Sequence, residues 1–177
     1  VGSFYSSRFQ KSHEEMMVSP VPDYIILLGY VPGGVIRAFV VGIAVYLVTI
    51  MFTDIPIYNI WLVILITFLT AFLFSTAGFI NAVYAKSFDD INIVTTFVLT
   101  PLTYLGGTFY SIEALPQVWQ DISIFNPIAY IISSYRLAFL GLEETSLLLS
   151  LFIIIVLIIV LFFLALMILS RGIGIKN

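Results

Sequence analysis

An uninterrupted apolar run of 23 residues, LLLSLFIIIVLIIVLFFLALMIL, occupies positions 147–169 of the chain. Twenty of these residues are Leu, Ile, Val or Phe, and none carries a charge. A helix of about 20 such residues crosses the roughly 30 Å hydrocarbon core of a bilayer, and each contributes about −0.3 to −0.6 kcal/mol near its centre. The run therefore predicts a transmembrane helix.

The composition of the whole chain has the same character. Of its 177 residues, 61% are hydrophobic. Only 10% are Asp, Glu, Lys or Arg, against about 25% in a soluble domain. A single compact core of this length cannot bury so much apolar surface from water, so lipid must be the solvent for most of it. We therefore expect an all-α integral membrane protein, built as a polytopic helix bundle in one domain, 1–177.

Charge and cysteine content exclude several other classes. Seven basic and ten acidic residues are spread along the chain, and no basic tract predicts a nucleic-acid partner. The chain has no cysteine, which rules out disulfides, a thiol nucleophile and a cysteine-ligated metal. The sequence starts VGSFYSSR, without an initiator Met or a signal peptide, so we expect it to be the C-terminal part of a longer protein.

Four stretches are long and apolar enough to span a membrane: 35–52, 60–84, 91–107 and 147–169. The third is the shortest, is rich in threonine and is interrupted by Pro101. A membrane helix tolerates proline only where neighbouring groups satisfy the freed carbonyl. The sequence predicts four spans, with the third the most irregular.

The segment 108–144 between the third and fourth spans predicts a cap of short re-entrant helices. Its apolar run from Pro127 to Gly141 is too short to cross a bilayer and contains Arg136. With four spans, all other basic residues fall on one side of the membrane: Arg8, Lys11, Arg37, Lys86, Arg171 and Lys176. The positive-inside rule therefore predicts cytoplasmic ends and an external cap.

Five aromatic residues cluster around this cap: Tyr104, Tyr110, Trp119, Tyr130 and Tyr135. An interfacial aromatic belt is sufficient to explain them, because amphipathic rings favour the headgroup level. A role in lining a substrate path is the alternative.

The most polar stretch, RFQKSHEEMMVSPVPDY at positions 8–24, predicts a short amphipathic helix on the cytoplasmic side. Ser12 and Glu15 form a capping-box pattern, and two prolines end the segment. A helix that starts a turn or two earlier places four residues on one stripe: Phe9, His13, Met16 and Met17. Such a helix either docks into a partner or lies on the membrane surface. Pro32-Gly33-Gly34 then predicts a break before the first span.

The sequence carries few groups suited to chemistry. Gly29 and Gly34 have the spacing of a phosphate-binding loop, but Val35 and Ile36 stand where Lys and Ser or Thr are required. His13 has no triad partners, and a single histidine cannot build a metal site by itself. Among the four predicted spans the only charged residue is Arg37. This argues against a proton-coupled carrier and against an intramembrane protease, because both need ionisable side chains within the spans. We expect no catalytic residue, no metal and no bound cofactor.

Several motifs occur in the order seen in one family. The segment LTPLTYLGGTFYSIEALPQVWQDISIFNPIAYIISSYRLAFLG, residues 99–141, resembles the signature region of the ABC-2 type transporter permeases, with a mild departure at Thr108. EEMMVSPVPDYIILLGYVPGGVIR resembles the loop between the second and third spans of that family, and AKSFDDINIVTTFVLTPLTYLGG resembles its loop and fifth span.

The resemblance implies a permease subunit of an ATP-driven exporter, located in the bacterial inner membrane. This chain would carry spans three to six and pair with a second copy as a homodimer. ATP and Mg²⁺ would be bound by a separate ABC ATPase subunit, and the cargo would be an amphiphile such as a lipid-linked polysaccharide, a lipid or a drug. A non-transporting membrane scaffold and a secondary carrier are the alternatives.

The resemblance also implies roles for two groups of residues. Region 4–19 would hold the coupling helix that docks into the ATPase, through Arg8, Lys11, His13, Glu14, Glu15, Met16 and Met17. The external re-entrant cap would consist of two short helices joined around Asn126-Pro127. Its residues are Pro116, Trp119, Asn126, Pro127, Tyr130 and Arg136.

Overall fold

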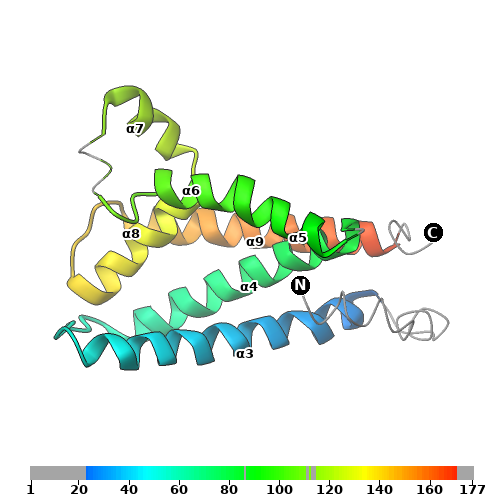
Figure 1. The fold of residues 1–177 in the computed structure, drawn as a ribbon, viewed down its shortest axis with the longest axis horizontal. Helices are drawn as coiled ribbons and strands as arrows, with labels where there is room; N and C mark the ends of the chain where they lie inside the picture. The colour runs from blue at the N-terminus through cyan, green and yellow to red at the C-terminus, as the bar shows by residue number, and fades with distance from the viewer. Residues whose placement is uncertain (1–22, 86, 111, 113–114, 171–177) are drawn as a thin grey trace.

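A computed structural model of the chain describes residues 23–85, 87–110, 112 and 115–170 (Figure 1). Its helices are α3 (Asp23–Ile50), α4 (Ile60–Tyr84), α5 (Phe88–Val94), the π-helix η1 (Thr95–Leu99), α6 (Thr100–Leu105), α7 (Gln117–Ile124), α8 (Pro127–Leu140) and α9 (Leu147–Ser170). The described part contains no strand, which confirms the all-helical prediction. The predicted coupling-helix region 4–19 lies outside the described residues.

Three helices are long and apolar enough to cross a membrane: α3, α4 and α9. Their mean hydropathies are 2.1, 2.3 and 3.7, and α9 is the helix expected from the uncharged run at 147–169. Asn59 caps the start of α4, where its side chain accepts a hydrogen bond from Leu62 N at 3.1 Å. The structure therefore has helices of spanning length at three of the predicted spans, although α3 begins at Asp23 and not near residue 35, and it ends at Ile50.

The prediction of a break at Pro32-Gly33-Gly34 is wrong, because α3 begins at Asp23 and continues through these residues. The reason is tertiary packing against α4. The Ser75 hydroxyl donates a hydrogen bond to the carbonyl of Val31 at 3.0 Å, directly before the proline. A Cβ at Gly34 would overlap that hydroxyl and lie 2.9 Å from Ser75 Cβ. Gly34 therefore permits a close crossing of α3 and α4.

The predicted third span consists of α5, η1 and α6 in direct succession, seven, five and six residues or eighteen in all. The π-helix ends just before Pro101, whose ring clashes with the carbonyl four residues earlier and so favours a wider turn. Threonine hydroxyls satisfy nearby carbonyls, as Thr100 does for Thr95 at 3.1 Å and Thr103 for Leu99 at 2.7 Å. Whether this segment crosses the bilayer remains a prediction.

Helix α4 is the centre of the bundle and packs against α3, α8 and α9. One buried cluster joins Leu27 and Val31 of α3 to α4 and α9 near the start of α3. A second, smaller cluster joins Leu73, Ile131 and Ile154 of α4, α8 and α9. Figure 1 shows α3 along one side of the bundle and α5–α6 along the other, with α7 projecting outward beyond α6.

Candidate functional site

The helix pair α7 and α8 confirms the predicted pair of short helices joined around Asn126-Pro127. Asn126 caps α8, since its side-chain oxygen accepts a hydrogen bond from Ile128 N at 3.0 Å, and Pro127 occupies the first turn. Gly141 ends α8 in the left-handed conformation, with φ of +71°. These local signals explain why α8 matches the predicted run so closely.

Two buried polar side chains attach this pair to the end of α6. The amide nitrogen of Asn126, a residue that is 2% exposed, donates to the carbonyl of Leu102 at 2.6 Å. The hydroxyl of Ser123 lies 2.9 Å from the carbonyl of Leu105. Gly106 permits this close approach, because a Cβ there would lie 3.1 Å from Ile128 of α8. The pair is thus fixed to α6 at the joint between its two helices.

Arg136 of α8 connects three segments. Its Nη1 forms an ion pair with Glu144, before α9, at 2.5 Å. Its Nη2 donates to the carbonyls of Gly107 at 2.6 Å and Tyr110 at 3.1 Å, in the loop after α6. The planar fork of arginine suits several acceptors at once, so Arg136 holds α8 to both loops and has its charge matched by a carboxylate.

The other predicted cap residues hold the pair together or face outward. Pro116 precedes the first turn of α7, and the Tyr130 hydroxyl donates to the carbonyl of Ile124 at 2.8 Å, which ties α8 back to α7. Trp119 is 46% exposed. The predicted coupling residues, by contrast, lie outside the described part of the chain: Arg8, Lys11, His13, Glu14, Glu15, Met16 and Met17.

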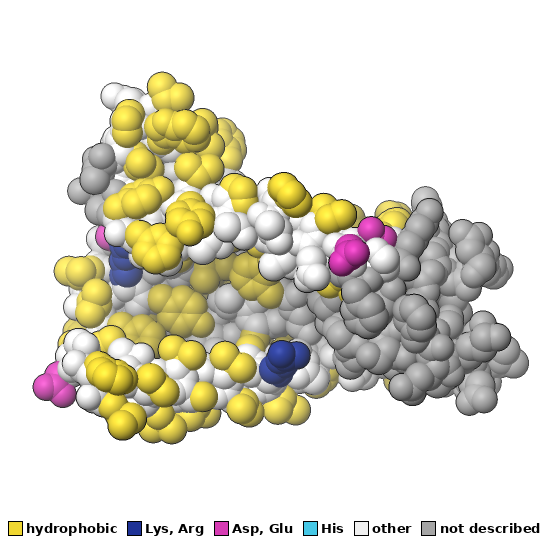
Figure 2. Space-filling model, viewed as in Figure 1, with side chains coloured by type: hydrophobic (Ala, Val, Ile, Leu, Met, Phe, Trp, Pro, Cys, Tyr) yellow, Lys and Arg dark blue, Asp and Glu magenta, His cyan; other side chains and the backbone are white. Residues whose placement is uncertain are grey.

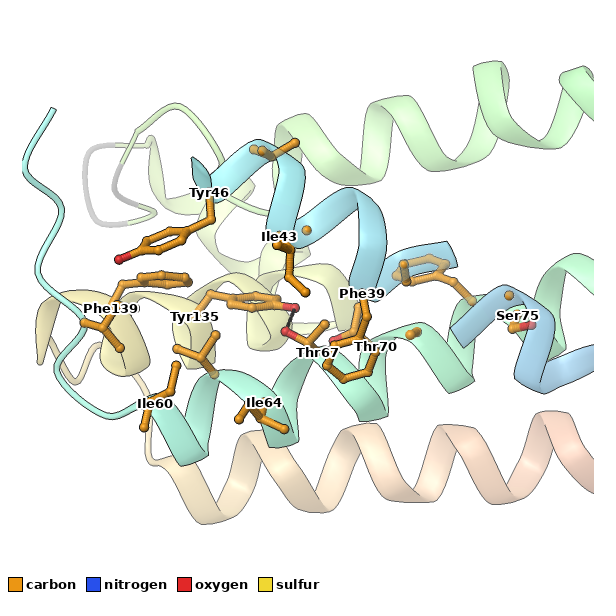
Figure 3. A pocket seen from close by; sticks show the side chains of 18 residues that line it. Phe39, Ile43, Tyr46, Ile60, Ile64, Thr67, Thr70, Ser75, Tyr135 and Phe139 are labelled. Carbon is orange, nitrogen blue, oxygen red and sulfur yellow. Dashed lines mark hydrogen bonds between the residues drawn. The ribbon is translucent and has the colours of Figure 1, made fainter. Parts of the chain in front are cut away.

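A cavity of about 940 Å³ lies between α3, α4 and α8. Figure 3 shows Tyr46 and Phe139 at one end of the cavity, Ser75 at the other, and Tyr135 reaching into its middle. Most of its lining is aliphatic or aromatic, and none of the described residues that line it is charged. The polar groups in the wall are hydroxyls, from Tyr46, Thr67, Thr70, Ser75 and Tyr135.

Tyr135 is the residue whose predicted surroundings differ most from those observed. Its hydroxyl donates to Thr67 Oγ1 at 3.0 Å, and its ring stacks on Phe139 with 6.2 Å between ring centroids. Phe139 in turn meets the ring of Tyr46 on α3 at 6.4 Å. Tyr135 therefore belongs to the cavity wall and not to an outward-facing aromatic belt. The sequence did contain a signal for this arrangement: Tyr135 and Phe139 are four residues apart, which places both rings on the same face of a helix.

A second cavity of about 410 Å³ continues the first toward the loops at the end of α8. The two share five lining residues: Gly42, Val45, Tyr46, Tyr135 and Phe139. The second also reaches Thr49, Thr108 and Arg136. The two cavities thus adjoin at a shared wall of α3 and α8 residues, and the second ends beside the Arg136 ion pair.

On the described part of the face in Figure 2, hydrophobic side chains are numerous and charged ones are few. Large hydrophobic residues are exposed on every long helix, for example Val40 at 61% on α3, Trp61 at 78% on α4 and Phe152 at 65% on α9. No group of three or more His, Cys, Asp or Glu residues in the described ranges could hold a metal ion. Such a surface suits contact with lipid.

Comparison with known proteins identifies the family. The ABC-2 type transporter family matches residues 2–140. The inner membrane transport permease YadH of Escherichia coli (strain K12) is 45% identical over 99% of this chain and 68% of its own length. Nodulation protein J of Rhizobium leguminosarum bv. viciae is 26% identical over 75% of this chain and 51% of its own length.

Another Nodulation protein J, of Sinorhizobium fredii (strain NBRC 101917 / NGR234), is 29% identical over 65% of this chain and 44% of its own length. No solved structure gives a significant match. The three long apolar helices and these relatives describe one kind of molecule: the chain belongs to the ABC-2 type transporter family and is a multi-pass membrane permease of the inner membrane.

Proposed function

We propose that this permease is the membrane subunit of an ATP-driven ABC exporter and forms the path for an amphiphilic or lipid-linked cargo. A separate ABC ATPase binds ATP and Mg²⁺, and two permease copies form a homodimer. The observation that carries the proposal is the family match over residues 2–140, supported by the 45% identity to an inner membrane transport permease along nearly the whole chain.

The position of the start of α3 supports the proposed coupling. The amphipathic segment 4–19 immediately precedes α3, which begins at Asp23. Leu27 and Val31, both fully or almost fully buried, pack there in one cluster with Phe79 of α4 and Ile168 of α9. A displacement of the coupling helix by the ATPase would therefore reach the best-packed part of α3, and packed helices transmit such shifts as rigid elements.

The proposal includes a fourth span and an external cap. The eighteen residues from Phe88 to Leu105 rise about 27 Å as a helix, close to the roughly 30 Å of a bilayer core. Figure 1 supports this geometry, because α5 to α6 run lengthwise from the end of the bundle where α9 finishes to the end where the α3–α4 loop lies. The pair α7–α8 then lies on the external side as a re-entrant cap.

Reporter fusions test this topology directly. A reporter that is active only outside the cytoplasm is joined after Glu143, and in a second fusion at the C-terminus. We expect activity after Glu143 and none at the C-terminus, because α9 separates the two positions. A third fusion at Asp54, in the α3–α4 loop, provides the control. If Glu143 and Asp54 report opposite sides, the segment 88–105 does not cross and the four-span proposal is wrong.

Co-purification and reconstitution with a candidate ATPase test the coupling. The full-length permease and ATPase are placed in vesicles, and ATP hydrolysis is measured with and without candidate amphiphiles. We expect hydrolysis to respond to cargo, and the replacement of Glu14, Glu15 and Met17 by Ala to abolish that response. Asp54→Ala is the matched control, since it removes an exposed carboxylate at the far end of the bundle.

Two results would contradict the proposal. If no ATPase co-purifies, the chain acts as a scaffold or as a carrier without ATP. If the Glu14, Glu15 and Met17 variant keeps its response, the coupling helix lies elsewhere.

A further inference from the structure

The cavity between α3, α4 and α8 has the dimensions and lining of a binding site for an amphiphile. Its volume of about 940 Å³ lies near the upper end of the roughly 300–1,000 Å³ that is usual for small-molecule sites. Helices α3 and α4 are both long and apolar enough to cross a membrane, which places the cavity between them within the depth of the hydrocarbon core. An apolar space that borders lipid fills with a hydrocarbon chain and not with water.

The shape of the cavity favours an elongated ligand. One end is closed by the contact of Gly34 with Ser75, where α3 crosses α4. From there the space extends between α3 and α4 to the ring of Phe139 on α8, which Tyr46 meets from α3 at 6.4 Å (Figure 3). The continuation past Gly42 leads to the second cavity. A single acyl chain fits such a lengthwise space better than a compact ligand does.

Hydroxyl groups in the middle of the cavity favour a ligand that carries a hydrogen-bonding group. Thr67 and Tyr135 are joined by a hydrogen bond of 3.0 Å, and the Thr70 hydroxyl, one turn further along α4, is buried beside the Tyr135 hydroxyl. Other span threonines satisfy their hydroxyls on a carbonyl four residues earlier, as Thr49 does at 2.8 Å and Thr76 at 2.9 Å. The bond that joins Tyr135 to Thr67 uses one donor, so the Thr67 hydroxyl proton and the lone pairs of the Tyr135 oxygen remain for a ligand that supplies a hydrogen-bonding group here.

We propose that this cavity binds an amphiphile with one apolar chain and an uncharged hydrogen-bonding group, such as an ester, a hydroxyl or an amide, beside Thr67 and Tyr135. A charged group has no unmatched counter-charge along the lining, because Arg136 at the far end of the second cavity is paired with Glu144. The identification of this ligand as the transported cargo rests on the proposed exporter function, whereas its binding in the cavity does not. Binding itself is measured without the ATPase.

Photolabelling of the full-length permease tests the site. The protein is placed in vesicles of phosphatidylethanolamine and phosphatidylglycerol that contain a monoacylglycerol with a diazirine in its acyl chain. Labelled peptides are quantified by mass spectrometry, with Phe74 as the reporter of the cavity wall and Phe152, 65% exposed on α9, as the reporter of the lipid surface. We expect label at both residues.

A matched pair of glycine variants separates the cavity from the general surface. Gly42→Phe places a ring in the cavity lining, whereas Gly33→Phe makes the same change at a residue of α3 that does not line the cavity. A side chain at either glycine would enter open space. We expect Gly42→Phe to lower the label at Phe74 roughly tenfold while Gly33→Phe leaves it unchanged. Label at Phe152 stays constant in both variants.

A second pair of measurements tests the polar requirement. In the double variant Thr67→Val, Tyr135→Phe the monoacylglycerol probe should label Phe74 about three- to tenfold less, because the hydroxyl contacts are lost. A diazirine-bearing hexadecane, which has no polar group, should label it equally in both proteins. The proposed site is wrong if Phe74 is not labelled in the unmodified protein, or if Gly42→Phe does not lower the label there. Equal loss for both probes overturns the polar requirement. ATPase coupling is measured separately and bears only on the exporter proposal.

Discussion

The attachment of the α7–α8 pair to α6 through Asn126 leads to a prediction of defined size. Asn126 makes two side-chain hydrogen bonds, one that caps α8 at Ile128 N and one to the carbonyl of Leu102 at 2.6 Å. Loss of an asparagine cap costs about 1 kcal/mol, and loss of a neutral hydrogen bond costs about 0.5–1.5 kcal/mol. The carbonyl of Leu102 still accepts from Gly106 N at 2.8 Å, so the substitution does not leave it unpaired.

We therefore expect Asn126→Ala to lower the free energy of unfolding by about 2 kcal/mol. Asn126→Ser keeps the cap but is too short to reach Leu102, so it should lower the free energy by about 1 kcal/mol. Asn59→Ala removes only a cap, that of α4, and provides the matched control with an expected loss of about 1 kcal/mol. Unfolding is followed by circular dichroism as a denaturing detergent is added to mixed micelles.

The order of the three variants decides the outcome. If Asn126→Ala costs less than about 0.5 kcal/mol, neither bond contributes as the geometry implies. If Asn126→Ser is as stable as the unmodified protein, the bond to Leu102 contributes nothing, and α6 is not what holds the helix pair. Amide exchange in α7, measured by mass spectrometry, should become faster in Asn126→Ala and change little in Asn59→Ala.

Three further substitutions test other contacts, each by the same unfolding measurement unless stated. Arg136→Lys should cost about 1–3 kcal/mol because one ammonium cannot serve a carboxylate and two carbonyls together, and an equally stable lysine variant would contradict that role. Gly34→Ala should cost about 1–3 kcal/mol by collision with Ser75, with recovery in the double variant Gly34→Ala, Ser75→Gly. Gly33→Ala, which meets open space, should be neutral or stabilising. Pro101→Ala should slow amide exchange in η1 and α6 roughly tenfold, because it restores a backbone donor, and unchanged exchange would mean that the π-helix has another cause.

Features written in a single stretch of sequence were predicted well. The apolar run at 147–169 became α9, and the run after Asn126-Pro127 became α8, with its glycine at the C-terminal end. Both depend on local properties, namely length, hydropathy and the chemistry of helix ends. The joint between α7 and α8 was placed correctly for the same reason.

Features that depend on the approach of separate helices were not predicted. Pro32-Gly33-Gly34 has the local character of a break, yet α3 continues through it because Gly34 fits against Ser75 of α4, more than 40 residues away in sequence. Tyr135 was assigned to an aromatic belt because its neighbours in sequence are interfacial, whereas its hydroxyl meets Thr67 on α4.

The sequence by itself determined that this chain is a helical membrane protein and where most of its helices lie, because the transfer of apolar residues to lipid and the capping of helix ends are properties of short segments. Only the tertiary structure decided that α3 is continuous, that Asn126 ties the helix pair to α6 while Arg136 holds α8 to two loops, and that α3, α4 and α8 line a cavity. Those outcomes depend on which surfaces meet, and no single segment contains that information.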